Sequence, residues 1–347
     1  MIILKRRINK KNPPFIVAEI SANHNNDLNR ALKLIDEAKR AGAHAVKLQT
    51  YTADTMTLNS KNKDFLIKDK KSLWKGKYLY ELYKKGSTPW EWHREIFNRA
   101  KKNKIICFST PFDETAVEFL EKFKPPVYKV ASFENNHIPL IKSIISKKKP
   151  IIISLGASKL NEIIELVKYL KKNKVKNYAL LKCTSSYPAQ VKDSNIKTIL
   201  DIKKRFNVEV GLSDHTPGIG ASIAAVAYGA SIIEKHFTLS RNDGGLDDSF
   251  SINPDELYSL VHETNRAWAS IGKKFYGILN SEKGSLIFKR SIYSSKEIKK
   301  GEMFTKNNIK VIRPNKGIAP KFYDKILGKK ALKNIKIATP LTFQHFK

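Results

Sequence analysis

The sequence contains little cysteine, no long apolar run and no glycine-rich dinucleotide motif. Its 347 residues include two cysteines, Cys107 and Cys183, too few for a disulfide framework or a zinc ligand set, which favours a reducing compartment. No apolar stretch approaches the length of a membrane-spanning helix, and the first residues, MIILKRRINKKNPP, lack the apolar core of a secretory signal. We therefore expect a cytoplasmic protein with no membrane partner.

Acidic residues are also scarce, since 32 Asp and Glu stand against 65 Lys and Arg and the formal net charge is +33. This balance favours anionic partners, including nucleic acid or anionic small molecules. The lysines are scattered, however, and the run KKNK occurs twice, at 101–104 and 171–174, where we expect helices to end. Scattered charge does not predict a nucleic-acid surface, so a basic nucleic-acid-binding protein remains only the alternative from another functional class.

Short apolar runs alternate with amphipathic segments along most of the chain. The runs are rich in Val and Ile and begin at Phe15, Ala45, Ile105, Val127, Pro150, Asn177, Val208 and Ile232. Such runs are typical of parallel strands buried on both faces, and helical periodicity lies between them, for example over 28–42 and 160–173. The pattern predicts an α/β fold, a closed (β/α)8 TIM barrel. A doubly wound open sheet is the rival, but no G-x-G-x-x-G follows the first run.

The pattern changes after a long predicted helix over 255–272. We expect a barrel over residues 1–276, a linker over 277–284 and a small β-rich domain over 285–347. The insert after the second strand, about 54–88, predicts a loop or lid over one end of the barrel. We expect Trp74, Trp90 and Trp92 to pack in the core or the lid rather than to contact a ligand.

Polar residues gather where the predicted strands end, which is where barrel enzymes hold their catalytic groups. The candidates, in chain order, are Glu19, Lys47, Gln49, Thr110, Lys129, Ser132, Glu134, Ser185, Tyr187, Ser213, Asp214, His215, Glu234 and His236. Lysines inside apolar strands are costly unless an anion meets them, so Lys47, Lys129 and Lys182 predict an anionic ligand such as a phosphate or carboxylate. The alternative for Lys47 is an internal ion pair with Glu19 or Glu234.

Two neighbouring strands end in histidine, at His215 and His236. Together they predict a divalent metal at the barrel mouth, although either one alone could be a satisfied buried histidine. Two imidazoles with open positions suit Mn²⁺, Fe²⁺, Zn²⁺ or Mg²⁺, and the spacing does not choose among them. Glu19 is a candidate acid–base group or a structural carboxylate, and Asp214 a catalytic residue or one that orients a histidine.

Six segments resemble the sialic acid synthase family in order and spacing. They are AEISANHNNDLNRALKLIDEAKRAGAHAVKLQTY, FSTPFDETAVEFL, YKVASFENNHIPLI, LLKCTSSYPA, GLSDHTPGIG and IIEKHFTL. The tail, KEIKKGEMFTKNNIKVIRPNKGI, resembles the antifreeze-like (SAF) domain of that family, so the resemblance covers essentially the whole chain. Within the family, the segments TYTADTMTLNSKNKDFLI, LWKGKYLYELYKKGSTPWEWH and KFYDKILGKKA resemble the pseudaminic acid synthase branch most.

The resemblance implies a transferase that condenses phosphoenolpyruvate with an N-acetylated amino sugar to give a nine-carbon 2-keto acid and phosphate. For the pseudaminic branch the sugar would be 2,4-diacetamido-2,4,6-trideoxy-altropyranose, and the alternatives are N-acetylneuraminate or legionaminate synthesis. The implied cofactor is a divalent metal, Mn²⁺ or Mg²⁺, held by His215 and His236.

The resemblance also implies roles for single residues. Those implied to hold phosphoenolpyruvate are Lys47, Thr110, Lys129, Ser132, Ser185 and Ser213. Those implied to lie near the sugar or the metal-bound water are Gln49, Tyr187 and Asp247, and Glu134 is a further substrate-binding candidate. Glu19 would be the acid–base residue. Arg313 would reach from the SAF domain into a neighbouring barrel and contact the sugar, which requires a domain-swapped homodimer. Neuraminic acid synthases often have Asn where this chain has Ser185, which is a departure from the family pattern.

Overall fold

The computed structural model describes residues 1–70 and 72–346. The chain divides into two compact units, 1–272 and 273–347. Among the described residues, no helix combines the length and the apolar character needed to cross a membrane.

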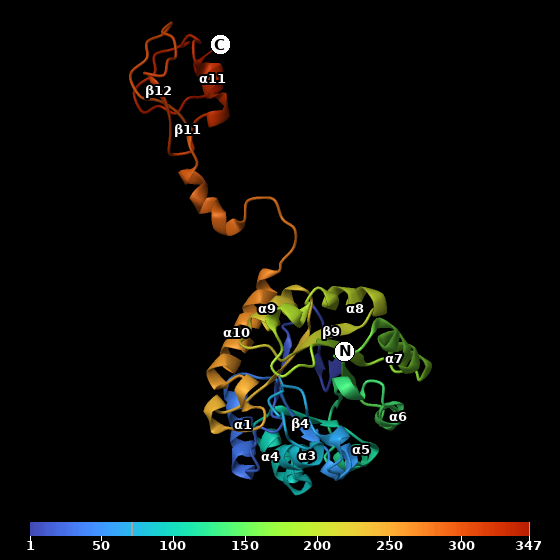
Figure 1. The fold of residues 1–347 in the computed structure, drawn as a ribbon. Helices are drawn as coiled ribbons and strands as arrows, with labels where there is room; N and C mark the ends of the chain where they lie inside the picture. The colour runs from blue at the N-terminus through green and yellow to red at the C-terminus, as the bar shows by residue number, and fades with distance from the viewer. Residues whose placement is uncertain (71, 347) are drawn as a thin grey trace. The chain divides into compact units, whose positions relative to one another are not determined.

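The described part of the first unit is built on a closed barrel of parallel strands in the order β10-β3-β4-β5-β6-β7-β8-β9 (Figure 1). The strands are β3 Phe15–Glu19, β4 Ala45–Thr50, β5 Ile106–Pro111, β6 Tyr128–Val130, β7 Ile151–Ser154, β8 Tyr178–Cys183, β9 Glu209–Asp214 and β10 Ile232–His236. Each lies beside its neighbour in sequence, and β10 closes the ring on β3 with His236 opposite Glu19. The predicted (β/α)8 barrel is confirmed, and the open sheet is excluded.

Helices surround the strands (Figure 1). They are α1 Leu28–Arg40, α4 His93–Lys102, α5 Glu114–Glu121, α6 Ile138–Ser146, α7 Leu160–Lys172, α8 Thr198–Phe206, α9 Gly220–Ala227 and α10 Pro254–Ser270. Local sequence sets several boundaries, since the Asp27 side chain accepts from Asn29 N–H at the start of α1 and Asn253 forms a capping box with Glu256 at the start of α10. Both KKNK runs lie at helix ends, where lysines suit the helix dipole.

The barrel core has two layers. One lies between strands and helices, and the other lies inside the barrel toward the start of the strands, where Phe15, Val17, Ala45, Phe108 and Ile232 are fully buried. A short hairpin, β1 Ile2–Ile3 and β2 Arg6–Arg7, packs Ile3 and Ile8 against this inner layer. The N-terminal end of the barrel interior is therefore filled, and any site must lie toward the other end.

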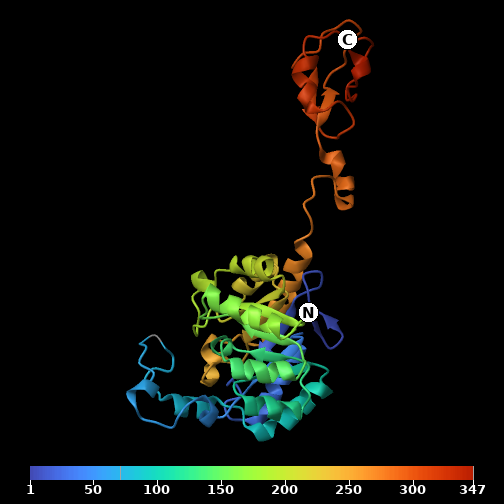
Figure 2. The same cartoon turned by 90° about the vertical axis from the view of Figure 1, so that its right-hand side faces the viewer.

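The insert between β4 and α4 was predicted as a loop or lid. It contains helical turns. These are α2 Ala53–Met56, η1 Lys63–Phe65 and α3 Leu79–Gly86. An isolated bridge pairs Leu66 with Tyr78. Figure 2 shows the insert, in light blue, extending from one side of the barrel.

The second unit is small and poor in helix. A 3-10 helix, η7 Asn280–Phe288, precedes strands β11 Ser291–Ser294 and β12 Ile309–Ile312, which pair antiparallel, and α11 Tyr323–Ile326 follows. Ile292, Phe304, Ile309 and Leu341 form part of its own buried core. Much of the region predicted as a linker is therefore helical.

Candidate active site

The inward-facing positions of the barrel strands change from apolar to polar toward the strand ends. Alternate residues of a strand share a face, so Glu19 follows Phe15 and Val17 on β3, and Lys47 and Gln49 follow Ala45 on β4. Thr110, Lys129, Ser154, Cys183, Ser213, Glu234 and His236 end the inward rows of the other strands. Most are nearly fully buried, so a polar layer lies directly against the apolar side chains that fill the N-terminal end of the barrel. We call these apolar side chains the plug.

Two lysines and two glutamates form the centre of this layer. Lys47 makes an ion pair with Glu19 and lies 3.9 Å from Glu234, so the internal pairing considered as the alternative for Lys47 does occur. Lys129 Nζ lies 3.7 Å from Glu234 and donates to Ser154 Oγ at 2.7 Å. Ser213 donates to Glu234 at 3.0 Å, and Lys47 donates to Thr110 at 3.0 Å.

Burial and neighbouring charges shift the pKa values of Glu19, Glu234 and Lys129 in different ways. Burial raises the pKa of Glu19, against the opposing charge of Lys47. Burial would raise the pKa of Glu234 too, but Lys129 and Lys47 outweigh it and the pKa is lowered. Burial lowers the pKa of Lys129, with Glu234 opposing. Glu234 therefore serves as the shared counter-ion, while Glu19 is the carboxyl that takes up a proton most readily, as an acid–base group must.

The two predicted metal ligands lie side by side, with their ring centroids 5.2 Å apart. His215 Nδ1 lies 3.0 Å from the Thr184 carbonyl oxygen, so donation there leaves Nε2 as the free nitrogen. His236 Nδ1 is buried with no hydrogen-bond partner and lies 3.8 Å from Asp247 Oδ2. Burial, followed by the charge of His215, holds the pKa of His236 well below its usual value, so the ring is neutral.

Two imidazoles at one barrel mouth, with His236 Nδ1 free of any hydrogen-bond partner, fit a divalent cation whose other positions are filled by water and substrate. Among the described residues, no group of three or more His, Cys, Asp or Glu is arranged as a complete ligand set.

Hydroxyl groups from two strand ends, Ser132 after β6 and Ser185 after β8, converge around Gly156. Its N–H donates to Ser132 Oγ at 3.0 Å. A Cβ at this position would collide with the Ser185 hydroxyl and would lie 2.7 Å from Ser132 Oγ. Gly156 is therefore required for the close approach of Ser132 and Ser185 beside Lys129 and Ser154.

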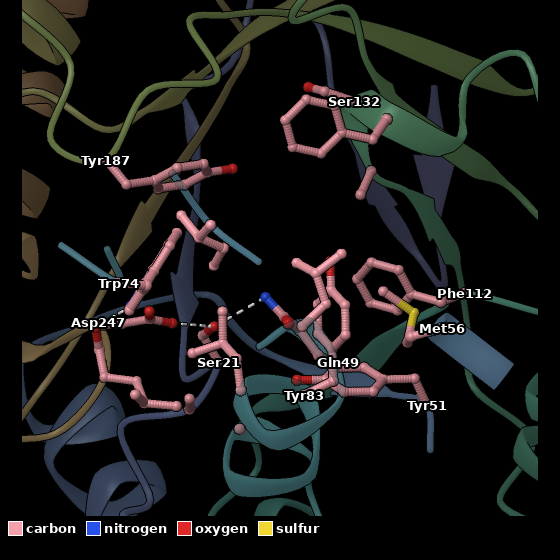
Figure 3. A pocket seen from close by; sticks show the side chains of 18 of the residues that line it. Ser21, Gln49, Tyr51, Met56, Trp74, Tyr83, Phe112, Ser132, Tyr187 and Asp247 are labelled. Carbon is pink, nitrogen blue, oxygen red and sulfur yellow. Dashed lines mark hydrogen bonds between the residues drawn. The ribbon is translucent and has the colours of Figure 1, made fainter. Parts of the chain in front are cut away.

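A pocket of about 450 Å³ opens above this layer (Figure 3). On its polar side Gln49 donates to Ser21 Oγ at 2.8 Å, and Ser21 donates to Asp247 Oδ2 at 2.6 Å. Figure 3 shows this chain across the floor, with Tyr187 and Trp74 above it. Tyr187 packs on His215, with ring centroids 4.4 Å apart. Glu134 also lines the pocket, and burial raises its pKa to about 7.

The structure brings most of the predicted residues together but not all. Asp214 lies on the other face of β9, where its carboxylate accepts from Ser222 at 2.6 Å and pairs with Lys235 at 3.0 Å. It does not line the pocket, so its predicted catalytic role has no support in this placement. Lys182 alternates with inward-facing Cys183, and its ammonium donates to the Cys183 carbonyl and Thr184 instead of joining the other two lysines.

Arg313 belongs to the second unit, where its guanidinium lies 5.8 Å from the Phe288 ring centroid. Its approach to a neighbouring subunit stays a prediction.

Sequence reasoning missed several members of the site. Trp74 lies in the insert predicted as a lid and also lines the pocket, whereas Trp90 stacks on Phe119 as packing residues do. Ser21 and Gly156 had no role assigned. Glu234 was among the predicted candidates, because it alternates with His236 on one face of β10. Trp74 has no such signal, because it lies in an insert without regular periodicity.

Known proteins share this architecture and sequence. The NeuB family model matches residues 34–276, and the SAF domain model matches residues 289–347. The chain is 46% identical over 327 residues to the pseudaminic acid synthase of Campylobacter jejuni, covering 94% of this chain and 95% of that protein. It is 38% identical over 325 residues to the N,N'-diacetyllegionaminic acid synthase of the same organism, covering 92% and 96%. The crystal structure of N-acetylneuraminic acid synthetase from Leptospira borgpetersenii, in complex with citrate, superposes with a TM-score of 0.73 and 33% identity, covering 82% of this chain and 94% of that one.

Proposed function

Because this chain belongs to the NeuB family, we propose that it is a pseudaminic acid synthase. It condenses phosphoenolpyruvate with 2,4-diacetamido-2,4,6-trideoxy-altropyranose to give a nine-carbon 2-keto sugar acid and phosphate. The observation that carries the proposal is a buried lysine pair with converging hydroxyls beside two free imidazoles, all at one barrel mouth. The higher identity to the pseudaminic than to the legionaminic relative supports the choice of sugar.

Phosphoenolpyruvate binds at the lysine end of the site. The residues proposed to hold its carboxylate and phosphate are Lys47, Thr110, Lys129, Ser132, Ser185 and Ser213. Protonation of Glu19, whose pKa burial raises, shifts the charge of this cluster toward positive, which suits a polyanionic ligand. The neutral hydroxyls add donors without adding charge, and Gly156 keeps space for them.

His215 and His236 would hold the divalent cation, Mn²⁺ or Mg²⁺, with Asp247 beside His236. When bound, the cation polarises the aldehyde carbonyl of the sugar. The Thr184 carbonyl orients the His215 ring, and burial keeps His236 unprotonated, so His236 presents a lone pair in place of a proton.

The reaction forms one carbon–carbon bond and replaces the carbon–oxygen bond to phosphate at C2 with a bond to the oxygen of water. C3 of phosphoenolpyruvate attacks the aldehyde carbon, and the aldehyde oxygen takes up a proton to become a hydroxyl. Water adds at C2, and the tetrahedral centre then loses phosphate, which leaves the 2-keto group. Glu19 is proposed to exchange these protons with the reacting groups, and Lys47 and Lys129 to stabilise the charge on the phosphate as the bond breaks.

The sugar occupies the pocket that opens beside the polar layer of the barrel. Gln49, Tyr187, Asp247 and Glu134 are proposed to contact it, since all four line the pocket. Arg313 of a neighbouring subunit is proposed to complete the site in a domain-swapped homodimer. The cytoplasmic location rests on the sequence and on the free state of both cysteines.

The direct test measures phosphate release from phosphoenolpyruvate with Mn²⁺ and one candidate sugar at a time, and identifies each product by mass. Release with the trideoxy altrose sugar alone supports the proposal. Release with N-acetylmannosamine or with the legionaminic precursor keeps the reaction type and overturns the sugar. No release with any sugar, from folded and metal-loaded protein, overturns the proposed function.

A further inference from the structure

The pocket has two chemically unlike sides. Its floor carries the polar chain from Gln49 through Ser21 to Asp247 (Figure 3). We call the other side the apolar wall, and it consists of Met56, Ile67, Trp74, Leu79, Leu82 and Leu246. All six side chains are half-buried, and all but Leu246 come from the insert after β4. Of the described residues between β4 and α4 that line the pocket, Tyr51, Ser72 and Tyr83 carry a hydroxyl.

The apolar wall is fastened to the barrel by Trp74. Its indole Nε1 donates to the Leu246 carbonyl oxygen at 3.2 Å, and its ring lies 5.9 Å from the Tyr187 ring centroid. Backbone hydrogen bonds between Ile67 and Lys77 and between Gly76 and Ile67 hold the insert's own shape. Because the polar atom of Trp74 is already used, the wall as a whole offers apolar surface to a ligand.

We propose that the apolar wall selects sugars that carry a methyl group, in place of a hydroxymethyl group, at the end remote from the aldehyde. This inference rests on the proposed function. The aldehyde carbon and C6 are opposite ends of a hexose chain, so an aldehyde placed at the floor beside His236 directs C6 away from the floor and toward the wall. A methyl group there buries apolar surface, whereas a hydroxyl would lose its water and find no partner among these side chains.

The size of the selection follows from the chemistry of the wall. An apolar subsite rejects a ligand that adds one hydroxyl by tens-fold, up to about a hundred-fold, and not more. A preference of this size separates 6-deoxy sugars from their 6-hydroxy counterparts without any hydrogen bond to C6. The wall is thus a specificity element supplied by the insert, separate from the reacting groups of the barrel.

The test compares two sugars that differ only at C6, the 2,4-diacetamido-2,4,6-trideoxy altrose and its 6-hydroxy counterpart, by kcat/KM for phosphate release. Wild-type protein should prefer the methyl sugar by tens-fold or more. The near-isosteric variants Leu82→Asn and Met56→Gln should each reduce the preference about tenfold, because each places an amide against C6. The matched control is Leu58→Asn, in the same insert, whose leucine is 68% exposed and does not line the pocket. It should keep the wild-type ratio.

Two results would overturn the inference while the proposed function stands. One is wild-type turnover of both sugars at equal kcat/KM, and this measurement decides even if a variant does not fold. The other is an unchanged ratio in folded Leu82→Asn and Met56→Gln, checked by circular dichroism. Absence of turnover with every sugar would remove the proposed function, and this inference with it.

Discussion

The two halves of the barrel interior have the same geometry and opposite chemistry. Near the start of the strands the inward positions hold Phe15, Ala45, Phe108 and Ile152, which pack into a dry plug. One or two alternations further along the same strands, the inward positions hold acids, lysines, hydroxyls and histidines, almost as deeply buried. Burial of the first set stabilises the fold, whereas burial of the second costs free energy unless its members pair. The comparison indicates that the polar half is retained for ligand chemistry.

The largest effect should come from removing an imidazole of the polar half. His236→Ala should abolish metal binding and lower phosphate release by about a thousandfold or more, with the fold intact, because only one ring nitrogen donor would remain. Bound metal can be measured by elemental analysis and the fold by circular dichroism. His262→Ala, at an exposed histidine on α10, is the control and should leave both unchanged. Metal-dependent turnover by His236→Ala would contradict the assignment of the ligands.

Substitution of two buried lysines tests the comparison further. Lys129 lies on the inward face of β6, and Lys235 lies on the outward face of β10. Lys129→Met should raise KM for phosphoenolpyruvate and lower kcat/KM by about a hundredfold or more, with little change in stability, because Glu234 keeps Lys47 as its partner. Lys235→Met leaves Asp214 buried and unpaired, and should cost about 3–5 kcal/mol of unfolding free energy. KM for phosphoenolpyruvate should not change in the Lys235 variant. Denaturant unfolding and steady-state kinetics on both variants check this, and exchanged outcomes would reverse the roles of the two faces.

Glu134 should make stability depend on pH. Burial raises its pKa to about 7, above the value of the unfolded chain, so the folded state binds the extra proton between the two values. The free energy of unfolding therefore falls as the pH rises from the pKa of the unfolded chain to about 7, and it levels off above that pH. Glu134→Gln should gain stability relative to wild type on going from pH 5 to pH 8, by at most about 3 kcal/mol. Thermal unfolding of both proteins at the two pH values tests this, and a constant difference would show that burial does not control the group.

Gly156→Ala should weaken phosphoenolpyruvate binding with a smaller effect on the fold. The added methyl would collide with Ser185 and crowd Ser132, so KM for phosphoenolpyruvate should rise about tenfold. Gly220→Ala is the control, because a Cβ there meets no atom within 4 Å. Equal KM values in the two variants would mean that the hydroxyl cluster does not hold the ligand.

The smallest effect should come from the apolar half. Ile152→Val removes one methylene from the plug, two positions before Ser154 on the same face of β7. It should lower the free energy of unfolding by about 0.5–1.5 kcal/mol and leave kcat/KM within about twofold. A large kinetic effect would mean that the two halves are mechanically coupled, and the distinction between them would fail.

Much of the fold and of the site was predictable because both are periodic. All eight barrel strands lie where apolar runs predicted them, and period-two alternation placed Lys47 beside Gln49. The same alternation, applied to β8 and β9, would have put Lys182 and Asp214 on the outer face. Reading strand-end residues as one group, without regard to face, assigned both to the site.

Other features could not be predicted because they depend on contacts between distant segments. The insert joins the pocket through Trp74 and Leu246, which are far apart in sequence, and a hydrogen bond between them has no local signature. The pairing of Lys47 with Glu19, in place of a free lysine, likewise depends on β3 lying beside β4.

The sequence by itself determined the barrel, the C-terminal domain and the residue types at the strand ends, because strand burial and alternation are local properties of the chain. Only the tertiary structure decided which carboxylate neutralises which lysine, which imidazole nitrogen is free, and which insert side chains form the apolar wall. These outcomes depend on distances of a few ångströms between residues far apart in the chain, and electrostatic and packing energies change steeply over such distances.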